Sequence, residues 1–268
     1  VSTQVPALQP ELLKRWIEVG FASGVMRNET DGLAGAGKTQ SRTQVTDTDN
    51  LPIWTKYAKL RTQLYPYLSA AQKKYDTTGV PIMRSLLLDY PTDAKAIALE
   101  DEYGFGPDLL AAPVLKQGAT SRTAYLPKGD WIDFWRSARL NPSTGGLEPT
   151  GSTLLTGGKS VTVPAPIDQI PLFVKAGAAI PLVSPDIWTL ADYGSDVVHL
   201  SDREDTRRIV AFPRGTWTGA LGVGETLTST EGSSSWALAI SGSRSRTYEV
   251  NAALGSLKAP FLSLIHIS

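Results

Sequence analysis

The chain has 268 residues, of which 41% are hydrophobic and seven are tryptophan, so it can form hydrophobic cores and disorder is not expected. Its 26 basic residues equal its 26 acidic residues, which leaves no net field to attract nucleic acid or an anionic membrane surface. Cysteine is absent, which excludes disulfides and thiolate metal sites without assigning a compartment. Apolar runs are short and broken by Gly or Pro, so no segment is predicted to span a bilayer.

A short helix is predicted near the start of the chain. Pro10 suits its first turn, and apolar residues then follow the 3.6-residue period of one helix face, namely Leu12, Leu13, Trp16 and Ile17. Gly20 is placed to end this helix, and residues 21–26 are typical of a short buried strand. Residues 30–50 are rich in Gly, Thr, Ser and Asp, which predicts a surface loop.

A longer helix is predicted after this loop, with Asn50 as its N-cap. Its apolar stripe is formed by Ile53, Trp54, Tyr57, Leu60, Leu64, Tyr67, Leu68 and Ala71. Pro66 lacks the N–H group that a helix ladder needs, so we expect a kink there. Helix, strand, loop and helix in this order indicate the closing units of an α/β domain.

From Val80 the pattern changes to short strand-like runs bounded by Gly, Pro and Asp. The first set is 82–90, 109–115, 121–126, 131–135, 160–163 and 170–182, the last interrupted by Gly177. The second set is 197–200, 208–212, 216–221, 235–240 and 247–250. The Ser- and Gly-rich segments 222–234 and 241–245 are predicted turns. Strands at such spacing predict antiparallel sandwiches, divided near Pro181–Pro185.

Four sequence motifs follow one another along the chain. They are LKRWIEVGFASGVMRNE at 13–29, then YAKLR, LYPY and TGVPIMR between 57 and 84, then EYGFGPDLLAAPV, YLP and WIDFW between 102 and 135, and finally IPLFVKAGAAIP at 170–181. Any one segment alone is a weak signal. In this order and at these spacings, the four resemble glycoside hydrolase family 31, of the α-glucosidase or α-xylosidase type.

The resemblance implies an α/β plus all-β chain, in which the end of a (β/α)8 TIM barrel precedes two antiparallel β-sandwich-like C-terminal modules. Residues 1–79 would be the last strand and helices of a truncated catalytic barrel. Residues 80–186 would be the proximal C-terminal β domain and 187–262 the distal one. The tail at 263–268 matches nothing in the family and is interpreted as non-native. Because the chain starts without Met or a leader pattern, we interpret its first residue as a cut edge.

The resemblance also implies the activity. Retaining glycosidases use two carboxyl groups about 5–5.5 Å apart. The family carries this pair on barrel strands upstream of the matched segments, so the nucleophile and the acid/base are expected upstream of Val1 and no catalytic residue is assigned here. The expectation is a fragment of a retaining α-glycoside hydrolase that cleaves O-glycosyl bonds of oligosaccharides or α-glycosides. The isolated chain should be inactive, and neither a cofactor nor a metal is implied.

A stand-alone carbohydrate-binding or structural β-sandwich protein is the alternative. Residues 11–79 discriminate between the two, because a free-standing sandwich does not need a barrel-closing strand and two helices. Neither a nucleic acid nor a membrane is an expected partner, and the sequence assigns neither a compartment nor an oligomeric state.

The candidate substrate-binding residues are Glu29 and Arg27, in the run Arg27-Asn28-Glu29. The family usually has a substrate-binding His at the position of Glu29. A carboxylate can accept hydrogen bonds from sugar hydroxyls, so the resemblance implies a sugar contact for Glu29, while a solvated loop carboxylate remains the alternative. Arg27 would orient Glu29 or support the strand end, with an ordinary ion pair as its alternative.

Other residues favour structural roles. Trp131 and Trp135 could stack on a sugar, but strand alternation places them on one face, opposite Asp133, which favours core packing. Asp202, Glu204 and Asp205 are interleaved with arginines, which indicates an ion-paired surface loop rather than a calcium site. The two histidines, His199 and His266, are interpreted as surface or packing residues.

Overall fold

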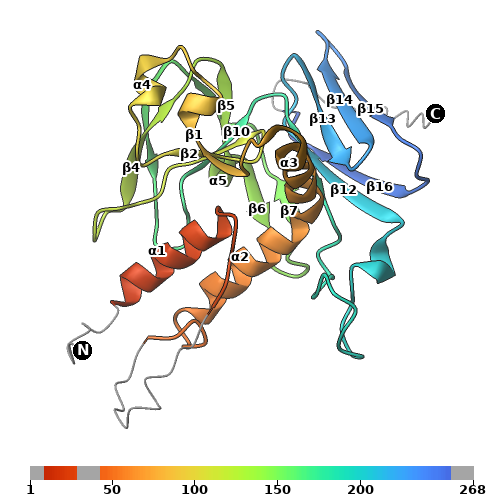
Figure 1. The fold of residues 1–268 in the computed structure, drawn as a ribbon, viewed down its shortest axis with the longest axis horizontal. Helices are drawn as coiled ribbons and strands as arrows, with labels where there is room; N and C mark the ends of the chain where they lie inside the picture. The colour runs from red at the N-terminus through yellow and green to blue at the C-terminus, as the bar shows by residue number, and fades with distance from the viewer. Residues whose placement is uncertain (1–8, 29–42, 255–268) are drawn as a thin grey trace.

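The computed structural model describes residues 9–28 and 43–254. The longer helices come first: α1 (Pro10–Phe21), α2 (Leu51–Gln63) and α3 (Tyr65–Thr78). They lie together below and beside a series of β-sheets (Figure 1). The remaining helices are single turns: η2 (Leu86–Leu88), α4 (Ala94–Ile97), α5 (Phe134–Ser137) and η3 (Ser201–Arg203). None of the helices within the described ranges has the length and apolar character needed to cross a membrane.

The predicted kink at Pro66 is confirmed as a break between two helices. α2 ends at Gln63 and α3 begins at Tyr65, with Pro66 in its first turn, where a missing N–H costs nothing. Asn50 occupies the N-cap position of α2, as predicted, but its side chain does not cap the helix. Its Nδ2 atom instead donates to the carbonyl oxygen of Gln44, at 2.8 Å, and so ties the preceding loop to α2.

The strand predicted at residues 21–26 is wrong. Helix α1 continues through Phe21, and the described residues after it form a turn and then irregular backbone. A strand is stable only beside a neighbour that pairs with its N–H and C=O groups. Within the described part of the chain no neighbouring strand runs alongside residues 22–28, so the apolar pattern alone does not produce one.

The largest sheet has six strands in the order β1-β2-β3-β10-β5-β8. Their bounds are Met83–Ser85, Tyr103–Phe105, Leu109–Ala111, Leu172–Lys175, Asp130–Asp133 and Leu154–Thr156. All of its neighbouring strands pair antiparallel. Two further antiparallel pairs flank it, β4 (Ser121–Leu126) with β9 (Lys159–Pro164) and β6 (Ala138–Leu140) with β7 (Leu147–Pro149).

Two three-stranded sheets complete the C-terminal part. One has the order β11-β12-β16, formed by Ala179–Leu182, Thr206–Ala211 and Thr247–Ala252, and its β12–β16 pair is parallel rather than antiparallel. The other is the meander of β13 (Thr216–Gly222), β14 (Glu225–Glu231) and β15 (Trp236–Ser241). Strand β14 corrects the prediction of a turn at 222–234. The strand predicted at 197–200 is also wrong, because the structure has only an isolated bridge between Thr189 and His199 there.

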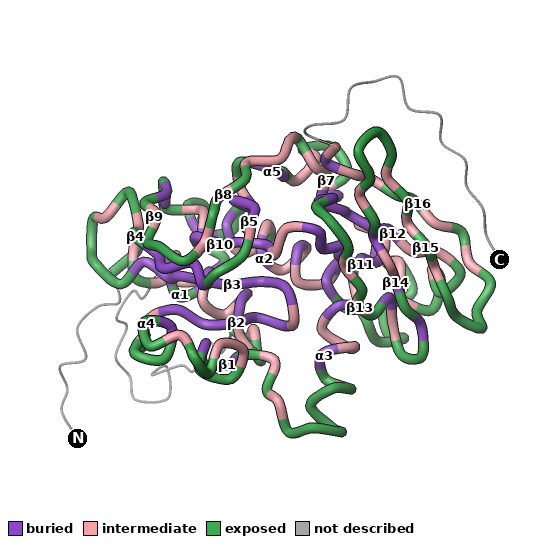
Figure 2. Tube along the Cα trace, turned by 90° about the horizontal axis from the view of Figure 1, so that it is seen from above, coloured by how far each residue is buried: buried purple, intermediate pink, exposed green. Residues whose placement is uncertain are grey.

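Buried residues gather in the middle of the molecule, mainly in the large sheet and the strands next to it (Figure 2). One core cluster joins α1, α2 and α3 to one face of that sheet, and a second lies between its other face and the β4–β9 pair. Trp131 packs in the second cluster, whereas Trp135 packs against the first. The prediction that both share one face is therefore wrong, because the strand ends at Asp133 and α5 redirects Trp135. The prediction of core packing is confirmed for Trp131, and Trp135 is half-buried at the edge of the core.

Candidate functional site

One buried arginine of helix α1 binds the loops next to strands β4 and β9. Arg15 pairs with Glu18 at 3.1 Å and also donates to the carbonyl oxygens of Ala165 at 2.9 Å, Pro166 at 3.0 Å and Ala119 at 3.1 Å. One side chain can bind all of these partners because the planar guanidinium carries several N–H donors that point in different directions. The arginine of the first family-like segment is therefore an anchor between α1 and the sheet.

Next to this anchor lies a polar cluster in which Glu18 and Tyr57 are buried, while Lys56 and Asp168 are partly exposed. The Tyr57 hydroxyl donates to the carbonyl oxygen of Asp168, at 3.0 Å, and accepts from Ile170 N, at 2.9 Å. Lys56 pairs with the Asp168 carboxylate at 2.8 Å. Burial raises the pKa of Glu18 to about 8, and this effect outweighs the stabilisation of its carboxylate by Arg15. The cluster connects α1 and α2 to the chain that enters β10.

The backbone that follows α1 is held by Arg61 of α2. Its Nη1 atom donates to the carbonyl oxygens of Phe21, at 2.6 Å, and Ser23, at 2.8 Å, and its Nη2 atom donates to that of Gly24, at 2.9 Å. The last carbonyl groups of a helix lack partners within the helix, and a cation is favoured there. Arg61 therefore fixes the path of the chain as it leaves α1.

Arg27 lies three residues beyond this clamp and is exposed to solvent. Glu29, the other candidate residue, lies outside the described residues. The chain before Arg27 borders a groove of about 520 Å³, whose lining includes Gly24, Met26, Trp54, Arg61 and Tyr65. Among the described residues, this lining includes no Asp or Glu. The described part of the lining therefore supplies neither carboxyl group of the pair that glycoside hydrolysis requires.

A second set of motif residues forms the joint between α3 and the sheet. The Tyr67 hydroxyl accepts from the backbone N–H groups of Asp108, at 2.9 Å, and Leu109, at 3.2 Å, and donates to the carbonyl oxygen of Phe105, at 2.8 Å. All three hydrogen bonds of this hydroxyl go to the turn around Gly106. Tyr67 of the LYPY segment and Gly106 of the EYGFG segment thus belong to one structural contact.

The other candidate residues have structural partners. The Trp131 indole donates to Pro127 O at 2.9 Å and the Trp135 indole to Ile170 O at 2.7 Å. Asp202 accepts from the backbone N–H of His199 at 2.8 Å and lies 3.0 Å from its ring, which raises the pKa of His199. Within the described ranges, no group of three or more metal-ligating side chains gathers. His266 lies outside those ranges.

The comparisons with known proteins agree with the motif series. Residues 79–180 match the profile described as the glycosyl hydrolase family 31 C-terminal domain. The chain is 37% identical over 178 residues to an isomaltosyltransferase of Sporosarcina globispora, a match that covers 64% of this chain and 15% of the relative. It is 33% identical over 172 residues to alpha-glucosidase 2 of Bacillus thermoamyloliquefaciens, covering 64% of this chain and 19% of that protein.

A solved structure also resembles the chain. The cycloalternan-forming enzyme of Listeria monocytogenes, solved with a pentasaccharide substrate, superposes with a TM-score of 0.64 at 28% identity. The match covers 86% of this chain and 21% of that enzyme. The mostly-sheet fold is thus that of a glycoside hydrolase C-terminal region. The chain is a member of glycoside hydrolase family 31, which confirms the resemblance. It spans about a fifth or less of the length of the curated relatives named above.

Sequence reasoning missed the roles of Arg15, Arg61 and Tyr67. All three were present in the quoted motifs, so a signal existed. Their partners lie far along the chain, however, as with Arg15 and Ala165, which are separated by 150 positions. A motif marks such residues without revealing what they hold.

Proposed function

We propose that this chain is the C-terminal part of a retaining α-glycoside hydrolase. In this proposal, residues 1–79 are the last units of the catalytic barrel, 80–186 and 187–262 are the proximal and distal β domains, and 263–268 are a non-native tail. The nucleophile and the acid/base come from the part of the enzyme that precedes Val1. The observation that carries the proposal is the fastening of α1 and α2 to the family domain by Arg15 and Tyr57. A stand-alone β-sandwich has no use for such a helix pair.

An exposed apolar surface on the helical part supports the same proposal. Trp16 is 69% exposed and Val25 is 72% exposed, and Leu12 and Leu51 are exposed as well. Each large apolar side chain left in water forgoes about 1.5–3 kcal/mol of burial. Strands and helices of a barrel that packed on α1 and α2 would cover this surface.

We further propose that Glu29 and Arg27 contact or support the substrate. The clamp formed by Arg61 directs the backbone beyond Gly24 along the groove, and Glu29 follows two residues after Arg27. In the complete enzyme the Glu29 carboxylate would accept a hydrogen bond from a sugar hydroxyl, and Arg27 would hold that carboxylate in place. The substrate would be an oligosaccharide or another α-glycoside, in keeping with the pentasaccharide bound by the Listeria relative.

The test compares this chain with the longer protein that contains it, using aryl α-glucosides and α-xylosides. The longer protein should hydrolyse at least one of them with retention of configuration at the anomeric carbon, as followed by proton NMR. The 268-residue chain, at the same concentration, should hydrolyse none. Hydrolysis by the chain alone would place a catalytic pair within these residues and refute the proposal.

A further inference from the structure

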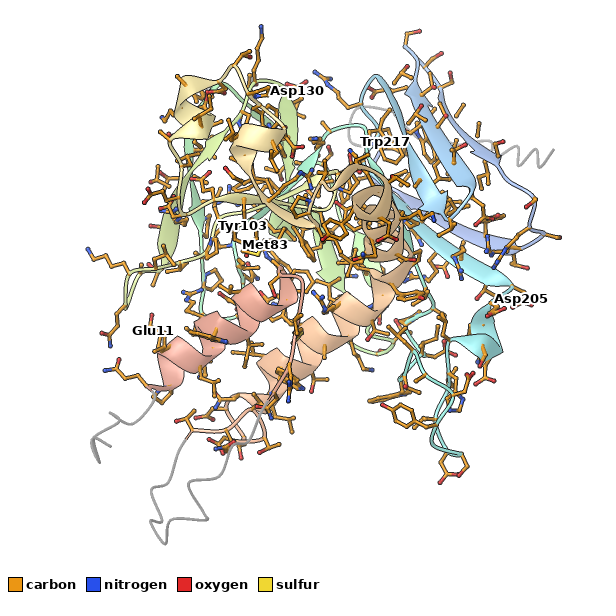
Figure 3. All side chains as sticks on the ribbon, in the orientation of Figure 1. Glu11, Met83, Tyr103, Asp130, Asp205 and Trp217 are labelled. Atoms are coloured by element: carbon orange, nitrogen blue, oxygen red, sulfur yellow. The ribbon has the colours of Figure 1, made fainter. Side chains whose placement is uncertain are left out.

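A second cavity lies between α3, the chain around Arg84 and strand β13, and it shares no lining residue with the groove beside Arg27. Its volume is about 200 Å³, and its lining includes Tyr67, Lys74, Arg84, Asp108, Trp217 and Thr218. Figure 3 shows Trp217 near the upper end of α3, where β13 approaches that helix. The cavity therefore lies where α3, the part of the six-stranded sheet near Arg84 and Asp108, and the β13-β14-β15 sheet meet.

The tryptophan in this cavity is held in a fixed position. Its Nε1 atom donates to Oδ1 of Asp108 at 2.9 Å, and its ring packs closely against Gly219 of the same strand. A Cβ atom at Gly219 would be 2.2 Å from Cζ2 of Trp217, so only glycine permits this placement. A rigid aromatic ring loses little conformational entropy when a ligand packs on it.

The carboxylate beside this ring is buried but has a free acceptor. Asp108 is 6% exposed, and burial raises its pKa, while the hydrogen bond from Trp217 and the nearby charges of Lys175 and Arg84 favour the ionised form. Within residues 9–28 and 43–254, its carboxylate receives a hydrogen bond only from Trp217, at Oδ1, which leaves Oδ2 for another donor. An ionised carboxylate is a stronger acceptor than a neutral carbonyl, and its strength increases where water is excluded.

The charges around the cavity nearly balance. Arg84 pairs with Asp89 at 2.7 Å, so its charge is already compensated. Lys74 is an exposed lysine of the lining and faces the negative charge of Asp108 across it. Lys175 also acts on the Asp108 carboxylate, so three cations face the two carboxylates of Asp89 and Asp108, and a charged ligand would find only a small excess of positive charge. A neutral ligand with one apolar face and several hydroxyl groups would find both an aromatic surface and a carboxylate acceptor.

We propose that this cavity is a second carbohydrate-binding site, which takes one neutral sugar unit against Trp217, with a hydroxyl of the sugar donating to Asp108. Lys74 donates to a second sugar oxygen from the rim. This site holds the chain on an α-glucan without taking part in bond cleavage. It concerns residues of the described chain alone, so it does not depend on whether the longer protein is a glycosidase.

The test is saturation-transfer NMR on the 268-residue chain with methyl α-glucopyranoside and maltose at millimolar concentrations. Three variants accompany the unaltered chain. Ala70→Leu fills the cavity from α3, Asp108→Asn keeps the acceptor for Trp217 but removes the charge, and Trp188→Phe changes an exposed tryptophan elsewhere as the control. Melting temperatures of all four proteins establish that each is folded.

We expect saturation transfer to both sugars from the unaltered chain and from Trp188→Phe. Ala70→Leu should lower the affinity at least tenfold, and Asp108→Asn should lower it severalfold, with both variants still folded. The proposal is overturned if the unaltered chain transfers no saturation, if Ala70→Leu binds as well as the unaltered chain, or if only Trp188→Phe loses binding.

Discussion

The ring of Tyr67 packs against the α-carbon of Gly106 so closely that a Cβ atom there would lie 2.4 Å from Cε1 of Tyr67. Gly106 also has a φ angle of 65°, in the left-handed region that residues with a Cβ atom rarely adopt. The Tyr67 hydroxyl bonds to the backbone on both sides of this glycine. One tyrosine and one glycine thus fix α3 against the sheet.

Gly106→Ala should destabilise the chain, because the new methyl group overlaps the Tyr67 ring and the backbone angle becomes strained. Overpacking of this kind costs about 1–3 kcal/mol, to which the strain adds. Chemical denaturation followed by tryptophan fluorescence measures the change. Gly118→Ala is the matched control: its φ angle is 74°, but no atom lies within 4 Å of the added Cβ. Equal losses in the two variants would show that the Tyr67 contact is unimportant.

Arg61→Lys should loosen the backbone after α1. A lysine keeps the charge but cannot reach all three carbonyl oxygens at once, and each hydrogen bond to a charged group contributes about 1.5–3 kcal/mol when formed. Hydrogen exchange measured by mass spectrometry should become faster in peptides that cover residues 22–28. Arg139→Lys, at an exposed ion pair of 3.9 Å, serves as the control and should leave these peptides unchanged. Unchanged exchange in Arg61→Lys would mean that the clamp does not order this segment.

Glu102 should make the stability depend on pH. Its side chain is buried, and burial raises its pKa from 4.5 to about 7, although it accepts hydrogen bonds from Tyr125 N at 2.9 and 3.0 Å. Between these values the folded chain keeps a proton that the unfolded chain releases. The contribution of Glu102 to the free energy of unfolding is therefore fully present below about pH 4.5 and is lost as the pH rises to about 7.

Glu102→Gln removes this titration while keeping an acceptor for Tyr125. Each unit of pKa elevation corresponds to about 1.4 kcal/mol. Between pH 4.5 and 7.5 the unaltered chain should therefore lose on the order of 2–3 kcal/mol more of its free energy of unfolding than the Glu102→Gln variant loses. Denaturation curves at several pH values measure this difference. Glu100→Gln, an exposed neighbour, should run parallel to the unaltered chain. Parallel curves for Glu102→Gln as well would contradict the raised pKa.

Trp131→Ala should act on stability rather than on sugar recognition. The indole is buried in the cluster between the large sheet and the β4–β9 pair and donates to Pro127 O. Truncation of a buried tryptophan costs about 3–5 kcal/mol. The melting temperature should fall strongly, while sugar binding by the folded fraction at the Trp217 cavity should remain. Loss of sugar binding without a lower melting temperature would assign Trp131 to a site instead.

Sequence patterns predicted the elements whose own residues decide their structure. The break at Pro66 follows from a missing N–H, and β4 follows from six residues of strand character at Ser121–Leu126. Strand β14 was missed because Ser, Thr and Gly are typical of turns. The strand forms because β13 and β15 pair with both of its edges, and its alternate residues Glu225, Leu227 and Ser229 are buried on the face where Leu227 packs with Ile209 of β12; both are tertiary effects.

The candidate site was predictable only as a position along the chain. The run that contains Arg27 and Glu29 was found from its resemblance to the family, not from local chemistry. Arg61, a residue of the next helix, binds carbonyl groups of Phe21, Ser23 and Gly24 just before this run, and this contact leaves no local pattern in either segment. The same holds for the cavity beside Trp217, whose residues come from three parts of the chain.

The most direct measurement of the central claim is the kcat/KM of the longer enzyme with Glu29→Gln, beside Glu100→Gln as a control on an exposed carboxylate. A lost charge-assisted hydrogen bond to a sugar hydroxyl costs roughly 1.5–3 kcal/mol, so kcat/KM should fall about ten- to a hundredfold with an unchanged melting temperature. Glu100→Gln should retain full activity. An unchanged kcat/KM in Glu29→Gln would make Glu29 a bystander on a solvated loop and contradict the account.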